Sequence, residues 1–236
     1  FYKHFIRKGH NLKARYGKDS WVIVTGATDG IGKGLCEEFA KTGFNIILVS
    51  RTLSKLNDVA NELKKINSSI KTHVVPFDFS EKTSVEDYTK AFGSLSDEYD
   101  ISVLVNNIGT GFNKVFNQHS GKETQDMISL NVLPQGLMSD IFIKKFILRN
   151  KTFKSKGLKS SIINISSFAS QGQYYNFILY NSVKGFNNNH SKLLSYELNE
   201  YDIDVMSVKP LWVDTPLIKR KKSIFPLCCY YYCYCI

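Results

Sequence analysis

The chain has 236 residues, 43% of them hydrophobic, which is enough for one large core and makes a single domain the default expectation. Its formal net charge of +10 comes from two short runs, residues 219–222 (KRKK) and the six basic side chains that residues 1–18 carry without an acid, namely Lys3, Arg7, Lys8, Lys13, Arg15 and Lys18. The rest of the chain is formally neutral, which argues against a nucleic-acid surface and leaves two readings of the runs, attraction to an anionic membrane or simple solvated charge.

Cysteine usage gives no sign of a disulfide framework. Cys36 is the only cysteine before position 228, and the other four crowd into residues 228–235. This distribution favours a reducing compartment for the body of the chain, and no metal site is expected.

An apolar run at residues 21–24 leads directly into the sequence TGATDGIGKG at residues 25–34. A strand that ends in closely spaced glycines and opens a helix presents unpaired N–H groups and a positive dipole end to a phosphate. The glycines at 26, 30 and 32 therefore predict a dinucleotide site, with an ordinary tight turn as the alternative.

Strands and helices alternate along the rest of the chain. Helices are expected up to Gly43, over 52–66, 83–95 and about 123–149, and around 180–184, between apolar strands at 45–49, 73–77, 101–105, 161–165 and 203–208. This alternation predicts an α/β fold with a doubly wound parallel sheet, helices on both faces and a ligand crevice at the carboxyl ends of the strands.

The second strand ends in Ser50-Arg51 rather than in an acid. An acid there would accept hydrogen bonds from the adenosine ribose, whereas a guanidinium suits a 2′-phosphate. Arg51 therefore favours NADPH over NADH, the alternative being a solvated arginine at a strand end.

Four side chains near the expected crevice suit carbonyl reduction. Tyr180 and Lys184 share a helix face at i and i+4, so the ammonium could lower the pKa of the phenol, which would donate a proton as hydride arrives. Ser167 would hold the carbonyl oxygen, and Asn131 could anchor a water that resupplies the proton.

These motifs together resemble the short-chain dehydrogenase/reductase family: TGATDGIG at 25–32, NNIG at 106–109, Asn131, Ser167 and YNSVK at 180–184. The resemblance implies a Rossmann-type sheet and gives Asn131, Ser167, Tyr180 and Lys184 the catalytic roles. It also implies that NADP(H) is contacted by Gly26, Thr28, Asp29, Gly30, Ile31, Gly32, Arg51, Asp78, Asn106, Tyr180, Lys184 and Thr215.

Within the family, RYGKDSWVIVTGATDGIGKG, INISS and VKPLWVDTPL resemble the very-long-chain 3-oxoacyl-CoA reductase and 17β-hydroxysteroid dehydrogenase group. This implies reduction of a long-chain 3-oxoacyl-CoA in fatty-acid elongation. The alternatives are a steroid or retinoid dehydrogenase with the same catalytic residues, and a catalytically silent NADP(H)-binding relative. A homodimer is a further expectation, and the resembled group acts at the cytoplasmic face of the endoplasmic reticulum membrane, with its anchor ahead of the domain.

Three regions are therefore expected: a basic juxtamembrane-like segment at 1–19, the NADP-binding domain at 20–218 and an atypical tail at 219–236. The tail ends in SIFPLCCYYYCYCI, which has neither a helical period nor a strand alternation. We therefore expect the sheet to end at its sixth strand, without the last strand and the substrate cap of the resembled family.

Overall fold

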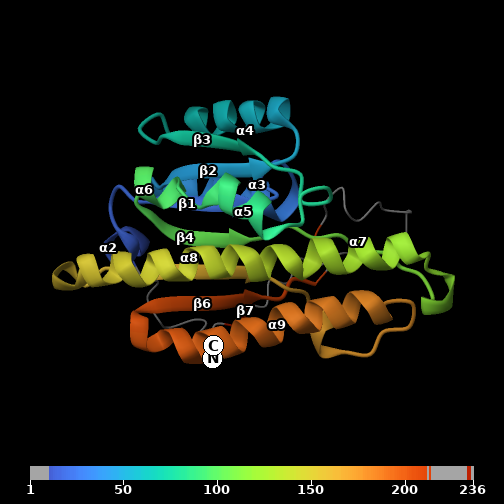
Figure 1. Ribbon diagram of the computed structural model, residues 1–236. Helices are drawn as coiled ribbons and strands as arrows, with labels where there is room; N and C mark the ends of the chain where they lie inside the picture. The colour runs from blue at the N-terminus through green and yellow to red at the C-terminus, as the bar shows by residue number, and fades with distance from the viewer. Residues whose placement is uncertain (1–10, 212, 214–232, 235–236) are drawn as a thin grey trace.

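The computed structural model describes residues 11–211, 213 and 233–234, and shows a twisted sheet between two layers of helices (Figure 1). Six parallel strands lie in the order β3-β2-β1-β4-β5-β6. Their bounds are β1 (Trp21–Thr25), β2 (Asn45–Ser50), β3 (Thr72–Pro76), β4 (Ile101–Asn106), β5 (Ser160–Ile165) and β6 (Ile203–Val208). The expected doubly wound parallel sheet is confirmed.

Each face of the sheet carries its own hydrophobic core. On one face, α3 (Gly30–Thr42) and α4 (Leu53–Ile66) cover side chains such as Val22 and Leu48. On the other face lie α5 (Val85–Phe92), α6 (Leu95–Glu98), α8 (Leu133–Thr152) and α9 (Ile178–Leu198). Because β1 and β4 are buried along their whole length, they read in the sequence as unbroken apolar runs.

Shorter elements connect these layers: α2 (Leu12–Tyr16), η1 (Phe116–Gln118), α7 (Gly121–Asn131), η2 (Lys154–Lys156), η3 (Phe168–Gln171) and η4 (Asn199–Tyr201). Local sequence sets several of their ends. Ser120 and Glu123 form a reciprocal capping box at the start of α7, and Gly43 ends α3 in the left-handed conformation, with φ +88°.

The single helix expected over about 123–149 is two helices, which is a correction. α7 ends at Asn131 and α8 begins at Leu133, with Val132 between them. Pro134 lies in the first turn of α8 and has no N–H to donate to the carbonyl of Leu130, so the hydrogen-bond ladder is interrupted there. The interruption falls at Asn131, one of the expected catalytic residues.

The start of the described chain belongs to the globular body. Arg15 of α2 forms a bidentate ion pair with Asp204 of β6, at 2.6 and 2.7 Å, and the Tyr16 hydroxyl donates to the same carboxylate. Buried Arg149 of α8 pairs with Asp100 and donates to the Tyr16 carbonyl at 2.7 Å. Residues 12–16 are therefore fixed to the sheet edge where the strands begin, whereas the sequence placed them in a separate segment.

The edge of β6 is not left unpaired along its whole length. β7 (Cys233–Tyr234) adds two residues antiparallel to β6, with Tyr234 opposite Ser207 and Cys233 opposite Val208. The expectation that the sheet ends at its sixth strand is therefore wrong in this detail, because a strand edge offers free N–H and C=O groups that another segment can pair with. Among the described residues, no helix is long and apolar enough to cross a membrane.

Candidate active site

The glycine turn lies where β1 meets α3, at the carboxyl edge of the sheet. Gly26 and Gly30 have φ of +65° and +50°, a region that favours glycine. Asp29 caps α3 and accepts a hydrogen bond from the Gly30 N–H at 2.7 Å. The turn thus contains the expected cofactor residues from position 26 to 32, with Thr28 and Ile31 among them, and it presents a helix N-terminus to the crevice.

Gly32 is required by the close approach of α3 to this turn. A methyl group at Gly32 would overlap the carbonyl oxygen of Gly26 and would lie 2.5 Å from Nδ2 of Asn107. By contrast, a methyl group at Gly34, two residues along the same helix, would meet nothing within 4 Å. Backbone this closely packed matches the approach that a dinucleotide phosphate needs.

Asn107, not Asn106, holds the turn in place, and the sequence did not single it out. Nδ2 of Asn107 donates to the carbonyls of Thr25 and Gly26 at 2.9 and 3.3 Å, and its N–H donates to the Thr25 hydroxyl at 2.9 Å. The Asn106 amide is buried and donates to Oδ1 of Asn164 at 2.8 Å. The Asn106 amide nitrogen is thus used inside the protein, and the expected cofactor contact at Asn106 stays a prediction.

Arg51 and Asp78 lie at the ends of β2 and β3, beside the glycine turn. Arg51 is exposed, and no carboxylate among the described residues lies within ion-pair distance of it. Asp78 accepts hydrogen bonds from the hydroxyl and the N–H of Ser80, which lower its pKa, and the charge of Arg51 lowers it further. Arg51 is thus available for an anionic group at this edge.

Ser167 and Tyr180 lie close together beyond the carboxyl end of β5. Ser167 follows β5 and begins η3, where its oxygen accepts the Ala169 N–H at 3.1 Å. Tyr180 is in the first turn of α9, between the backbone of Gly111 and the ring of Phe177, which lies 6.1 Å away. Burial raises the pKa of Tyr180, and its interaction with the Ser167 hydroxyl offsets part of that rise.

Lys184 is buried behind Tyr180, with its ammonium 5.8 Å from the centre of the phenol ring. Its Nζ donates to the Ile165 carbonyl at 3.0 Å, and desolvation lowers the Lys184 pKa to about 8. A methyl group at Gly109 would lie 3.3 Å from this Nζ and 2.6 Å from Oδ1 of Asn131. The expected catalytic residues are therefore brought together, with Lys184 and Asn131 facing the same small space.

The expected lowering of the Tyr180 pKa by Lys184 is not found. Burial raises the pKa of Tyr180, because phenolate is poorly solvated there, and the hydrogen bond from Ser167 offsets only part of that rise. Lys184 is itself desolvated, so its charged form is also disfavoured. The spacing of the pair could be read from the sequence, but the depth at which both groups are buried could not.

Two further expectations concern a cofactor contact at Thr215 and the lack of a metal site. Thr215 lies outside the described residues. Within those residues, no cluster of His, Cys, Asp and Glu could hold a metal ion.

Comparison with known proteins gives this geometry a family context. Residues 20–223 match the family described as short chain dehydrogenase. The chain is 35% identical to a very-long-chain 3-oxoacyl-CoA reductase of Coccidioides immitis, over 93% of this chain and 60% of the relative. It is 36% identical to the enzyme of that name from Pyricularia oryzae, over 94% of this chain and 65% of the relative. It thus spans less than two thirds of the length of these relatives.

Solved structures show the same architecture. A 3-ketoacyl-(acyl-carrier-protein) reductase from Brucella melitensis, crystallised with NADH, superposes with a TM-score of 0.72 at 27% sequence identity. The match covers 84% of this chain and 77% of that one.

The two glycines of α3 provide a matched test of the dinucleotide turn. We expect Gly32→Ala to abolish dinucleotide binding and to destabilise the fold, because the new methyl group overlaps the Gly26 carbonyl. Gly34→Ala should bind the dinucleotide normally. It should also raise the free energy of unfolding by up to about 1 kcal/mol, since alanine favours a helix and the space is open. Calorimetric titration with NADPH and thermal melting measure both; equal loss of binding in the two variants would contradict the assigned turn.

Proposed function

Because the chain belongs to the short-chain dehydrogenase family, we propose that it is an NADPH-dependent reductase of long-chain 3-oxoacyl-CoA. The observation that carries the proposal is the convergence of Tyr180 and Ser167 beyond the carboxyl end of β5 with Lys184 and Asn131 behind them. The substrate class is supported by the names of the relatives from Coccidioides and Pyricularia.

The residues present fit a nicotinamide cofactor. The tight turn at Gly26 and Gly32 suits a pyrophosphate, Arg51 suits an adenosine 2′-phosphate, and Lys184 suits the hydroxyls of the second ribose. When bound, such a cofactor supplies hydride to the carbonyl carbon. The chain itself has to hold the substrate oxygen and protonate it.

Tyr180 and Ser167 divide that task. The Ser167 oxygen accepts the Ala169 N–H, and its hydroxyl, which lies beside Tyr180, would donate to a carbonyl oxygen bound there. The raised pKa of Tyr180 keeps its phenol protonated at neutral pH, as a proton donor must be. The ammonium of Lys184 would stabilise the phenolate that forms. Oδ1 of Asn131, which has no partner within the described part of the chain, could hold a water that returns the proton.

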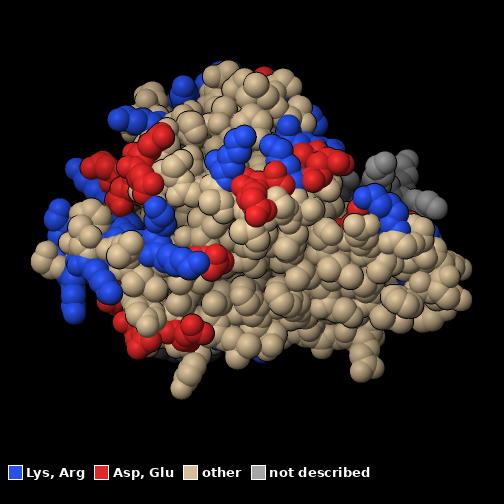
Figure 2. Space-filling view, in the orientation of Figure 1, with Lys and Arg blue, Asp and Glu red and all other residues tan. Residues whose placement is uncertain are grey.

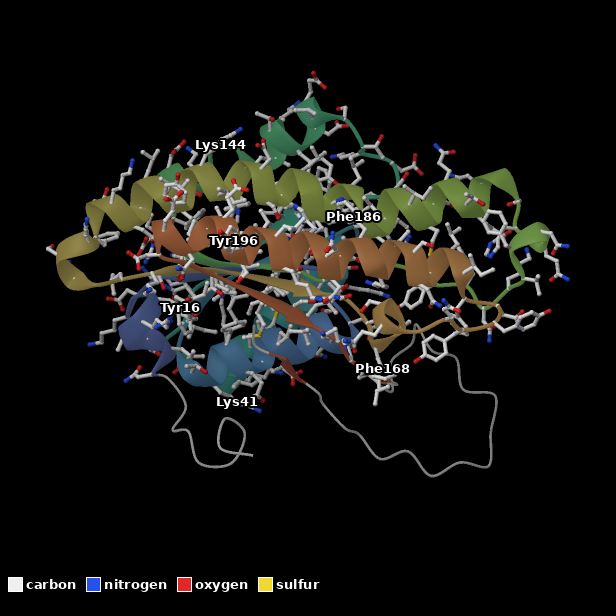
Figure 3. The ribbon with its side chains drawn as sticks, turned by 90° about the horizontal axis from the view of Figure 1, so that it is seen from below. Tyr16, Lys41, Lys144, Phe168, Phe186 and Tyr196 are labelled. Carbon is white, nitrogen blue, oxygen red and sulfur yellow. The ribbon has the colours of Figure 1, made fainter. Side chains whose placement is uncertain are left out.

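Apolar side chains border this site and would suit a fatty-acyl chain. Phe168 comes directly after Ser167, is 38% exposed and lies well apart from Tyr16 (Figure 3). Phe177 packs against Tyr180 itself. An aliphatic chain or a steroid could lie on such a surface, so the activity test includes both kinds of ketone.

We expect Tyr180→Phe to lower the turnover of a long-chain 3-oxoacyl-CoA roughly 10²- to 10⁴-fold while NADPH binding is retained, because only the proton donor is removed. Tyr175→Phe is the matched control, since Tyr175 is 81% exposed shortly before α9. NADPH oxidation is measured with the acyl-CoA and with a 17-oxosteroid. Substantial turnover in Tyr180→Phe would show that Tyr180 is not the catalytic acid. A preference for the steroid would overturn the proposed substrate class. Wild-type protein that binds NADPH but reduces neither ketone would be a catalytically silent relative.

We propose a preference for NADPH over NADH on the strength of Arg51. A charge-assisted contact to the 2′-phosphate contributes about 1.5 to 3 kcal/mol, roughly ten- to a hundred-fold in affinity. Arg51→Ala should remove this preference, whereas Lys64→Ala, which removes a charge from the last turn of α4, should keep it. Titration of both cofactors decides; similar affinities for both in the wild type would refute the role of Arg51.

We also propose that the protein acts at the cytoplasmic face of the endoplasmic reticulum membrane, as the resembled group does. Within the expected N-terminal basic segment, Lys13 donates to the Gly43 carbonyl at 2.8 Å and Arg15 pairs with Asp204, so these two charges are used internally. Exposed lysines at the end of α8 and in η2 have no carboxylate within ion-pair distance among the described residues: Lys151, Lys154 and Lys156. The end of α8 lies at the left of Figure 1, where Figure 2 shows several Lys and Arg side chains.

Vesicle flotation tests this surface. Replacing Lys151, Lys154 and Lys156 by Gln should weaken binding to phosphatidylserine vesicles at low salt by roughly 1 kcal/mol per lysine. Replacing Lys55, Lys90 and Lys192, which are also exposed but lie elsewhere, should change it little. Equal effects of the two triple variants, or no binding to anionic vesicles by the wild type, would contradict the proposed surface.

A further inference from the structure

The break between α7 and α8 is held by a side chain from a third helix. Nδ2 of Asn187, on α9, donates to the main-chain carbonyl of Asn131 at 2.7 Å and to Oε1 of Gln135 at 2.6 Å. Nε2 of Gln135 in turn donates to the Asn187 carbonyl at 3.3 Å and lies 2.9 Å from Nδ1 of His190. The junction at Asn131 is thus tied to α9 through a buried polar cluster rather than through apolar packing.

The chemistry of this position calls for an amide. Asn187 is 2% exposed, and its two N–H bonds are directed at two carbonyl oxygens. Of the common side chains, only a neutral amide offers two hydrogens from one nitrogen at this length. A carboxylate would place oxygen against oxygen, and an apolar side chain would leave two buried acceptors unpaired.

The same junction determines where the Asn131 side chain points. Its Nδ2 donates to the carbonyls of Thr110 and Met127 at 2.9 and 2.8 Å, which leaves Oδ1 buried and without a partner among the described residues. That oxygen and Nζ of Lys184 are the two atoms that a methyl group at Gly109 would meet first. Lys184 and Asn187 are at i and i+3 on α9, so they lie on the same face of that helix. This face therefore positions both the Lys184 ammonium and, through Asn187, the main chain at Asn131.

We propose that Asn187 is a positioning residue, which fixes the main chain at Asn131 and thereby aims Oδ1 of Asn131 at the space beside the Lys184 ammonium. In its catalytic consequence this rests on the proposed reductase function. Asn187 donates to neither the Tyr180 phenol nor the Lys184 ammonium, and it acts through Asn131.

The next residue along α9 is a matched control. Asn188 is also a buried amide, 7% exposed, but its Oδ1 accepts from the Ser207 hydroxyl of β6 at 3.0 Å. Substituting Leu at 187 or at 188 therefore removes one buried amide of the same size from the same helix. Of the two substitutions, only the one at Asn187 removes a hydrogen bond to Asn131.

Turnover in a double-mutant cycle tests the catalytic consequence. We expect Asn187→Leu to lower kcat about tenfold or more with the KM for NADPH unchanged, and Asn188→Leu to leave kcat near the wild-type value. In an Asn131→Ala background, Asn187→Leu should have no further effect on kcat, because the group it positions is gone. A similar kcat loss in both Leu variants, or additive losses at 131 and 187, would overturn the proposal.

Amide hydrogen exchange tests the positioning separately from the reaction. Asn187→Leu should speed exchange at residues 127–136 at least about tenfold, whereas Asn188→Leu should not, and this readout requires no substrate. If the wild type reduces no 3-oxoacyl-CoA, the proposed function fails while the exchange result still decides on Asn187. Unchanged protection in Asn187→Leu would refute the positioning role of Asn187. If the Leu variant does not fold, Asn187→Ser, which keeps one donor, serves as the second variant.

Discussion

The whole candidate site depends on a lysine ammonium held in the interior at the carboxyl edge of the sheet. Burial of a cation is costly unless it is hydrogen-bonded, and Lys184 meets this requirement with the Ile165 carbonyl at the end of β5. Its neighbours follow from that placement: Gly109 leaves room for it, and Tyr180 lies one helical turn before it. The desolvation that lowers the pKa of Lys184 also raises that of Tyr180, so burial disfavours the charged form of both groups.

The sheet could be predicted from the sequence because each of its parallel strands is a short apolar run followed by a polar turn. The glycine turn and the Tyr180 to Lys184 spacing were readable for a similar reason, since both are local patterns. The roles of Asn106 and Asn107 were not readable. Every residue of β4 is buried, so no alternation of apolar and polar residues marks which way a side chain at its end will point.

The break at Asn131 and the pairing of β7 depend on partners that are remote in the sequence. The proline at 134 was visible, but a proline near a helix start is compatible with a continuous helix or with a new one. What holds the break is Asn187, 56 residues further on. In the sequence, nothing distinguishes the three adjacent asparagines at 187–189; the packing of α9 reveals that two of them are buried. Long-range polar pairings of this kind leave no periodic signal.

The bond between α2 and β6 has a consequence for the order in which the chain folds. Arg15 and Asp204 are 189 residues apart in sequence, and Tyr16 reaches the same carboxylate. Ribosomes deliver the N-terminal end first, so residues 12–16 emerge long before their acceptor exists. Such distant contacts carry a large loop-closure entropy, which must be overcome before they contribute anything. The ion pair of Arg15 with Asp204 therefore requires β6 to have been synthesised, whereas Lys13 of α2 can contact the Gly43 carbonyl much earlier.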